Sequence, residues 1–177
     1  SQKLQWMADQ FEKIQKDGGN PEFELGEMPK WLSSCPSFDA PSPASDDINY
    51  STCPPTDYEK LAKIVETTVD YFKNKRGLNV AYSVWSGEVE GIHWSDDEES
   101  FFKLYKYSVL GARRADPKAK IGVGFIFWDS PHYYYPKDGG GEVKSTKGPM
   151  LRNLIRYASQ TPLPELGLAK LPIDFIE

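Results

Sequence analysis

The sequence contains no long apolar run, and its 177 residues include only two cysteines and two histidines. A helix that spans a bilayer needs about 18 consecutive apolar residues or more, so we predict no membrane span. The cysteines and histidines are too few and too scattered to close a zinc site, and we predict neither a metal ion nor a cofactor. A Ser-His-Asp spacing and a nucleophile elbow are absent as well.

An excess of basic charge is also missing. Lysine and arginine total 21 against 26 aspartates and glutamates, which gives a net charge of -5. Duplex nucleic acid is held largely by cations that neutralise phosphates, so we predict no nucleic-acid partner. No glycine-rich phosphate loop follows a predicted strand, because the glycines at 122 and 124 lie inside one and those at 139–141 follow a long loop. The absence of such a loop counts against a dinucleotide-binding fold.

The sequence does contain enough apolar residues for a folded core, at 39% hydrophobic and 14% aromatic. Aromatic side chains have two common uses that this composition does not separate. They fill cores, and they line carbohydrate clefts, where the apolar face of a sugar stacks on a ring.

Hydrophobic periodicity alternates between helix and strand along the whole chain. Capping boxes that begin at Thr56 and Ser95 predict the starts of two helices. This alternation indicates right-handed crossovers and a mostly parallel α/β sheet of about four strands, which both an open doubly wound sheet and a closed barrel satisfy. The predicted helices lie near 4–14, 56–76, 95–114 and 149–158, and the predicted strands near 22–26, 78–85, 121–128 and from 173 onward.

Several of these segments resemble glycoside hydrolase family 39. Residues 23–32, Phe-Glu-Leu-Gly-Glu-Met-Pro-Lys-Trp-Leu, resemble the Glu-Leu-Gly-Phe-Met-Pro motif of that family's third strand. Residues 82–85 resemble its fourth strand, and residues 171–176 resemble its sixth. The resemblance implies a partial (β/α)8 TIM barrel in which residues 1–177 form one fragment, from about the second helix to the start of the sixth strand. Both chain ends also look internal, so we expect a piece of a longer protein.

The resemblance is imperfect where the chemistry would lie. The family's fourth strand ends in Trp-Asn-Glu-Pro-Asn, whose Glu is the general acid and base, whereas this chain has Trp-Ser-Gly-Glu-Val. If Trp85 and Trp94 both match the family's tryptophans, Ser86 takes the Asn position and Gly87 takes the acid position. If the alignment slips by one residue, Glu88 takes the acid position.

Retaining glycoside hydrolysis needs two carboxyl groups, one as acid and base and one as nucleophile. Glu88 is the candidate for the first, and the family's nucleophile would lie beyond Glu177. The alternative without a catalytic role is that Glu88 and Glu90 are acidic side chains in a solvent-exposed loop. Rings and polar groups near Glu88 and after the third predicted strand are candidates for binding sugar: Trp85, Ser86, Glu90, His93, Trp94, Trp128, Asp129 and His132.

Two functions remain open at this point. The first is retaining hydrolysis of O-glycosyl bonds in the full-length protein, with an oligo- or polysaccharide as substrate. The second is a catalytically degenerate glycosidase-like barrel that binds sugar or serves a structural role, for which Gly87 at the aligned acid position is the supporting feature.

The two cysteines, Cys35 and Cys53, lie in one proline-rich loop. A bridge between them would fit a secreted or periplasmic protein, whereas two free thiols would fit a cytosolic one. The sequence leaves both the bridge and the location open.

Overall fold

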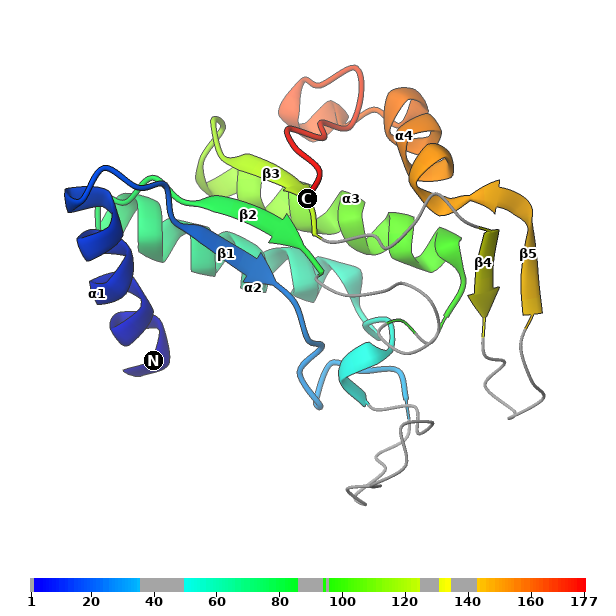
Figure 1. Ribbon diagram of the computed structural model, residues 1–177, viewed down its shortest axis with the longest axis horizontal. Coiled ribbons are helices and arrows are strands. Elements are labelled where there is room, and N and C mark those ends of the chain that lie inside the picture. Colours follow the sequence, from blue (N-terminus) through cyan, green and yellow to red (C-terminus); the bar gives the residue numbers. More distant parts are fainter. Residues whose placement is uncertain (1, 36–49, 86–93, 95, 125–130, 135–142) are drawn as a thin grey trace.

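A computed structural model describes residues 2–35, 50–85, 94, 96–124, 131–134 and 143–177, with only the backbone described at 131–134 and 143–149. Four longer helices and five strands follow one another through these ranges (Figure 1). They are α1 (Gln2–Lys16), β1 (Glu22–Leu25), α2 (Tyr58–Asp70), β2 (Ala81–Val84), α3 (Glu98–Ala115), β3 (Lys120–Val123), β4 (Pro131–Tyr134), β5 (Val143–Pro149) and α4 (Met150–Gln160), with short helical turns η1 (Tyr50–Thr52), η2 (Tyr71–Lys75) and η3 (Pro164–Leu166).

Strands β1, β2 and β3 form one parallel sheet in chain order. Phe23 pairs with Tyr82, and Tyr82 with Ile121. A parallel bridge between Val123 and Ile176 places the last segment beside β3, where the fourth strand was expected. The predicted parallel α/β sheet is therefore confirmed, while its closure into a barrel stays a prediction.

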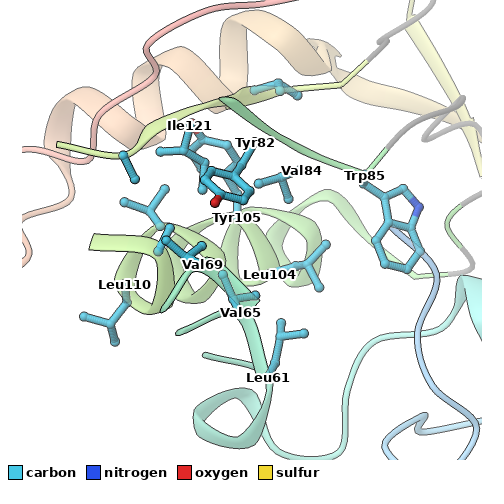
Figure 2. Close-up of a cluster of buried hydrophobic side chains, with 14 of the residues drawn as sticks. Leu61, Val65, Val69, Tyr82, Val84, Trp85, Leu104, Tyr105, Leu110 and Ile121 are labelled. Carbon is cyan, nitrogen blue, oxygen red and sulfur yellow. The ribbon is translucent and has the colours of Figure 1, made fainter. Parts of the chain in front are cut away.

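The main core lies between the sheet and the two helices that cover one of its faces. Figure 1 shows α2 and α3 against this face, and Figure 2 shows strand and helix side chains meeting there. Burial of each such aliphatic side chain contributes roughly 1.5–3 kcal/mol, so this layer holds the strands in place. The buried set includes Leu61, Val65, Val69, Tyr82, Val84, Leu104, Tyr105, Leu110 and Ile121. Within the described ranges, no helix is both long and apolar enough to cross a membrane.

Helix α1 joins this layer through rings and one arginine. Phe11 lies 5.3 Å from Phe72, and Phe72 lies 5.2 Å from Phe23 of β1, measured between ring centroids. Arg76 donates to Asp9 at 2.6 Å and to Glu12 at 2.7 Å. Helix α1 is thus attached both to β1 and to η2 with the arginine that follows it.

The helix starts differ from the predicted capping boxes. Asp57, not Thr56, caps α2 by accepting from the Lys60 backbone N–H at 3.0 Å. Thr56 instead donates its hydroxyl to the Leu32 carbonyl at 3.1 Å, so it is not available to the helix. At α3 the cap is Asp97, two residues after the predicted Ser95. A carboxylate both accepts the free N–H and interacts favourably with the positive end of the helix dipole.

A β-hairpin was not predicted. β4 and β5 pair antiparallel, and β5 continues through Pro149, so α4 begins at Met150 rather than at the predicted Gly148-Pro149. The sequence of β5 is Val-Lys-Ser-Thr-Lys-Gly-Pro, which has a single strongly apolar residue. Strand prediction from alternating hydrophobicity has little to detect in such a segment.

The last segment is fixed to β3 by backbone and side-chain bonds. The Val123 N–H donates to the Phe175 carbonyl at 3.2 Å, and the Ile121 N–H donates to the Asp174 carboxylate at 2.9 Å. A Cβ at Gly122 would collide with the Phe175 carbonyl oxygen and ring. Glycine is therefore the residue that allows this close approach.

The loop before α2 contains a disulfide bond between Cys35 and Cys53, whose Cα atoms are 5.9 Å apart. This settles the alternative that the sequence left open in favour of the bridge. Next to it, Ser33 and Pro55 form an isolated antiparallel bridge. The two ends of the intervening segment are therefore held together.

We expect the double variant Cys35→Ser/Cys53→Ser to lower the free energy of unfolding by about 3 kcal/mol, because the cross-link closes a loop of about 18 residues in the unfolded chain. Urea titration with and without a reducing agent measures this difference. Reductant should destabilise the wild type and leave the double variant unchanged. Two titratable thiols in the native, unreduced wild type would contradict the bridge.

Candidate active site

The carboxyl ends of the parallel strands lie at one edge of the sheet, which we call the strand-end edge. Trp85 N–H donates to the Leu25 carbonyl at 3.3 Å, and Gly124 N–H donates to the Val84 carbonyl at 3.2 Å. Glu177 N–H reaches the Val123 carbonyl at 3.2 Å. Ligands of α/β sheets bind outside the carboxyl ends of the strands, so this edge is the candidate active site.

Two residues at the strand-end edge have a left-handed backbone. Trp85, directly after β2, has φ of 62°, and Glu27, two residues after β1, has φ of 55°. This conformation is unfavourable for residues with a Cβ and costs on the order of 1–3 kcal/mol. Such strain occurs preferentially at functional sites, and here it occurs at the ends of neighbouring strands.

The Trp85 and Trp94 side chains lie in the core at this edge. They are 5% and 0% exposed, and their ring centroids are 5.2 Å apart in an edge-to-face arrangement. Trp94 also donates its Nε1–H to the Asp97 carbonyl and to Ser100 Oγ, each at 3.1 Å. The two rings thus anchor the beginning and the end of the segment 86–93. Direct stacking of either ring on a sugar stays a prediction.

Most of the other predicted site residues are not among the described ones. Glu88 lies outside the described residues, between the Trp85 and Trp94 anchors. The same holds for Ser86, Glu90, His93, Trp128 and Asp129, and for the side chain of His132 in β4. In the part of the chain that is described, no three His, Cys, Asp or Glu side chains are grouped so that they could hold a metal ion.

A pair of carboxyl groups that the sequence did not assign to the active site lies across the sheet from the helices. Glu22 and Glu24 alternate with the core residue Phe23 in β1, so they point away from the helical layer. The pKa of Glu177 is raised to about 7. The largest cause is a hydrogen bond with Glu22, and partial burial and the negative charges of Glu22 and Glu24 add to it. A carboxyl group with a pKa near 7 is suited to proton transfer at neutral pH.

A groove of about 1070 Å³ lies elsewhere, between the first turns of α3 and the side of α4. It opens on the helical side of the molecule and includes no residue of the strand-end edge. The two features are therefore separate candidate sites.

Comparison with known proteins relates the chain to glycoside-cleaving enzymes. No family model matches the sequence. It is 25% identical over 112 residues to a β-xylosidase from Caldicellulosiruptor saccharolyticus, which covers 59% of this chain and 21% of that protein. Its fold is similar to that of a glucosidase from Croceicoccus marinus, with a TM-score of 0.54 and 17% identity over 94% of this chain and 27% of the other. These findings support a glycoside hydrolase-like relationship, and they do not single out family 39.

We expect Trp94→Phe to destabilise the protein by about 1–3 kcal/mol, because it removes both hydrogen bonds of the indole N–H and leaves a space where the buried ring packed. Trp31→Phe is the matched control, since Trp31 is 68% exposed and the change should be close to neutral. Urea unfolding followed by circular dichroism compares the two variants with the wild type. Equal midpoints for both variants would show that the indole bonds at position 94 contribute nothing.

The raised pKa of Glu177 predicts a pH-dependent stability. A carboxyl group that binds its proton more tightly in the folded state stabilises fully below its unfolded pKa near 4.5, and this contribution is lost as the pH rises through about 7. The free energy of unfolding should therefore fall between pH 5 and pH 8 in the wild type, and fall less in Glu177→Gln. Glu66→Gln, a change on α2 away from the sheet, should keep the wild-type dependence. If the free energy of unfolding depends on pH equally in all three proteins, the interaction of Glu177 with Glu22 and Glu24 does not raise its pKa.

Proposed function

We propose that this chain is part of a retaining glycoside hydrolase of the family 39 type that acts on β-linked xylosides. The observation that carries the proposal is the similarity over 112 residues to a β-xylosidase, which includes more than half of the chain. The family 39 assignment rests on the motif at residues 23–32 and on the order of the later segments. The chain corresponds to about a fifth of that relative, so the activity belongs to a longer protein that contains it.

The architecture supports the same proposal. Barrel enzymes carry their reacting groups at the carboxyl ends of parallel strands, and three such ends align here. The segment that follows Trp85 contains Glu88 and leaves directly from this edge. A strained residue three positions before a candidate acid fits an active-site position.

In the proposed mechanism Glu88 is protonated when the substrate binds and donates this proton to the glycosidic oxygen as the bond to the leaving sugar breaks. A carboxylate from a later strand, outside this chain, attacks the anomeric carbon and forms a covalent glycosyl–enzyme. Glu88 then takes a proton from water, which displaces the enzyme carboxylate and releases the second sugar. The surrounding candidates would bind sugar hydroxyls and rings: Trp85, Ser86, Glu90, His93, Trp94, Trp128, Asp129 and His132.

A second function is favoured by one observation. Both Trp85 and Trp94 are buried and packed on each other, so the spacing between them is a structural constraint. An alignment that keeps both anchors places Gly87 at the acid position. The alternative proposal is therefore a glycosidase-like barrel that has lost its acid and retains sugar binding.

The bridge between Cys35 and Cys53 bears on where the protein acts. Disulfides persist in oxidising compartments and are rare in the cytosol of most organisms. This supports a secreted or periplasmic location, where xylan-type polysaccharides would be accessible.

The test compares Glu88→Gln with Glu66→Gln in the full-length protein. Glu88→Gln should lower turnover of xylobiose by about 10²–10⁴, because its leaving sugar needs protonation. The kcat/KM for 4-nitrophenyl β-xyloside, which reports only the step that releases nitrophenolate, should fall much less, since nitrophenolate leaves without protonation. Glu66→Gln, on α2 and with the same change in charge, should leave both rates close to wild type.

Two other outcomes would decide against this assignment. Unchanged rates in Glu88→Gln, with an active wild type, would exclude Glu88 as the acid. A wild-type protein that binds xylo-oligosaccharides without cleaving either substrate would favour the degenerate barrel.

A further inference from the structure

The groove between α3 and α4 has walls formed by two pairs of aromatic rings. Tyr58 and Tyr107 have ring centroids 5.4 Å apart, and Phe102 stacks on Tyr157 at 5.2 Å with an interplanar angle of 29°. The three tyrosines are partly exposed, whereas Phe102 is buried behind them. The groove therefore offers ring surfaces that are already held in position.

Polar groups of both signs lie between these rings. Residues 96–99 contribute four carboxylates, and α3 and α4 contribute three cations, Lys103, Lys106 and Arg156. Lys103 lies over the Tyr58 ring, 4.3 Å from its centroid. The buried carboxylate of Glu98 accepts from the Asn153 amide at 3.1 Å. The groove is thus close to neutral in total and rich in hydrogen-bonding groups.

This composition narrows the class of ligand. A strongly anionic ligand would meet the four carboxylates, and a strongly cationic one would meet the three cations. A neutral polyhydroxylated ligand fits both features, because its apolar ring faces can pack on the tyrosines while its hydroxyls bond the polar groups. The volume of about 1070 Å³ lies at the upper end of ordinary small-molecule pockets, which suits a ligand of several linked rings.

We propose that the α3–α4 groove is a binding site for a neutral oligosaccharide, separate from the strand-end edge. Helix α3 begins where the segment after β2 returns, so the groove opens near the same end of the sheet as the edge, on the outer side of the helices. Binding there needs no catalytic group, and the site goes beyond the proposed hydrolase function. A polysaccharide held in the groove would be kept near the edge without occupying it.

The experiment measures xylohexaose and cellohexaose binding by titration calorimetry to the full-length protein carrying Glu88→Gln, which slows cleavage of the xyloside during the titration. Turnover of 4-nitrophenyl β-xyloside is measured with Glu88 in place. Tyr107→Ala should raise the Kd of one binding event about tenfold. The loss of one ring contact weakens binding by roughly the free energy that a tenfold change in Kd represents. Arg156→Ala/Gln160→Ala on exposed positions of α4 tests the same groove with less risk to folding. Trp6→Ala is the matched aromatic control, because Trp6 is 64% exposed on α1 and lies outside the groove.

The proposal is supported if the groove variants lose this binding, keep the wild-type unfolding midpoint and keep their aryl-xyloside turnover, while Trp6→Ala changes nothing. It is overturned if neither hexasaccharide binds at a site other than the strand-end edge, or if the α4 double variant and Trp6→Ala bind like the wild type. Absence of turnover with groove binding intact would instead contradict the hydrolase proposal alone, so the two failures are distinguishable.

Discussion

Backbone pairing between β1, β2 and β3 runs in one direction, so each strand must be joined to the next by a segment that returns along the sheet. Helices α2 and α3 are these segments, and their apolar faces cover one side of the sheet. The same constraint brings all carboxyl ends to one edge, which places Glu27, Trp85 and Gly124 just after the ends of neighbouring strands. The candidate active site is thus a consequence of parallel pairing, and the groove arises from the helices that this pairing requires.

The larger elements could be predicted from the sequence because their signals are local. The apolar stripe of α2 and the short runs around Tyr82 and Ile121 identify their elements without knowledge of the rest of the chain. The cap of α2 was misplaced because Thr56 bonds Leu32, a partner that lies 24 positions earlier. The β4–β5 hairpin was missed because β5 carries little apolar alternation. Local patterns therefore identified the elements, whereas contacts between distant segments decided their ends.

The candidate site was less predictable. The sequence named Trp85 and Trp94 together as candidates for binding sugar, but only the fold shows that they pack edge to face in the core. Glu22 and Glu24 carry a visible signal, since they alternate with apolar residues on β1. Their partner, Glu177, is more than 150 positions away, and no spacing rule connects the two. The groove tyrosines come from three different helices. In the sequence each one looks like an ordinary residue of an amphipathic helix, so nothing indicates that they meet.

The attachment of the final segment to β3 has a consequence for biosynthesis. The first amides of β3 find their acceptors in Asp174 and Phe175, and the Ile121–Asp174 bond spans 53 positions. A ribosome that adds about 5–20 residues per second needs roughly 3–10 s to cover that interval. For that time the outer side of β3 is an unpaired edge while α2, β2 and α3 can already have packed. During those seconds a chaperone or fast elongation would limit the pairing of this edge with another chain.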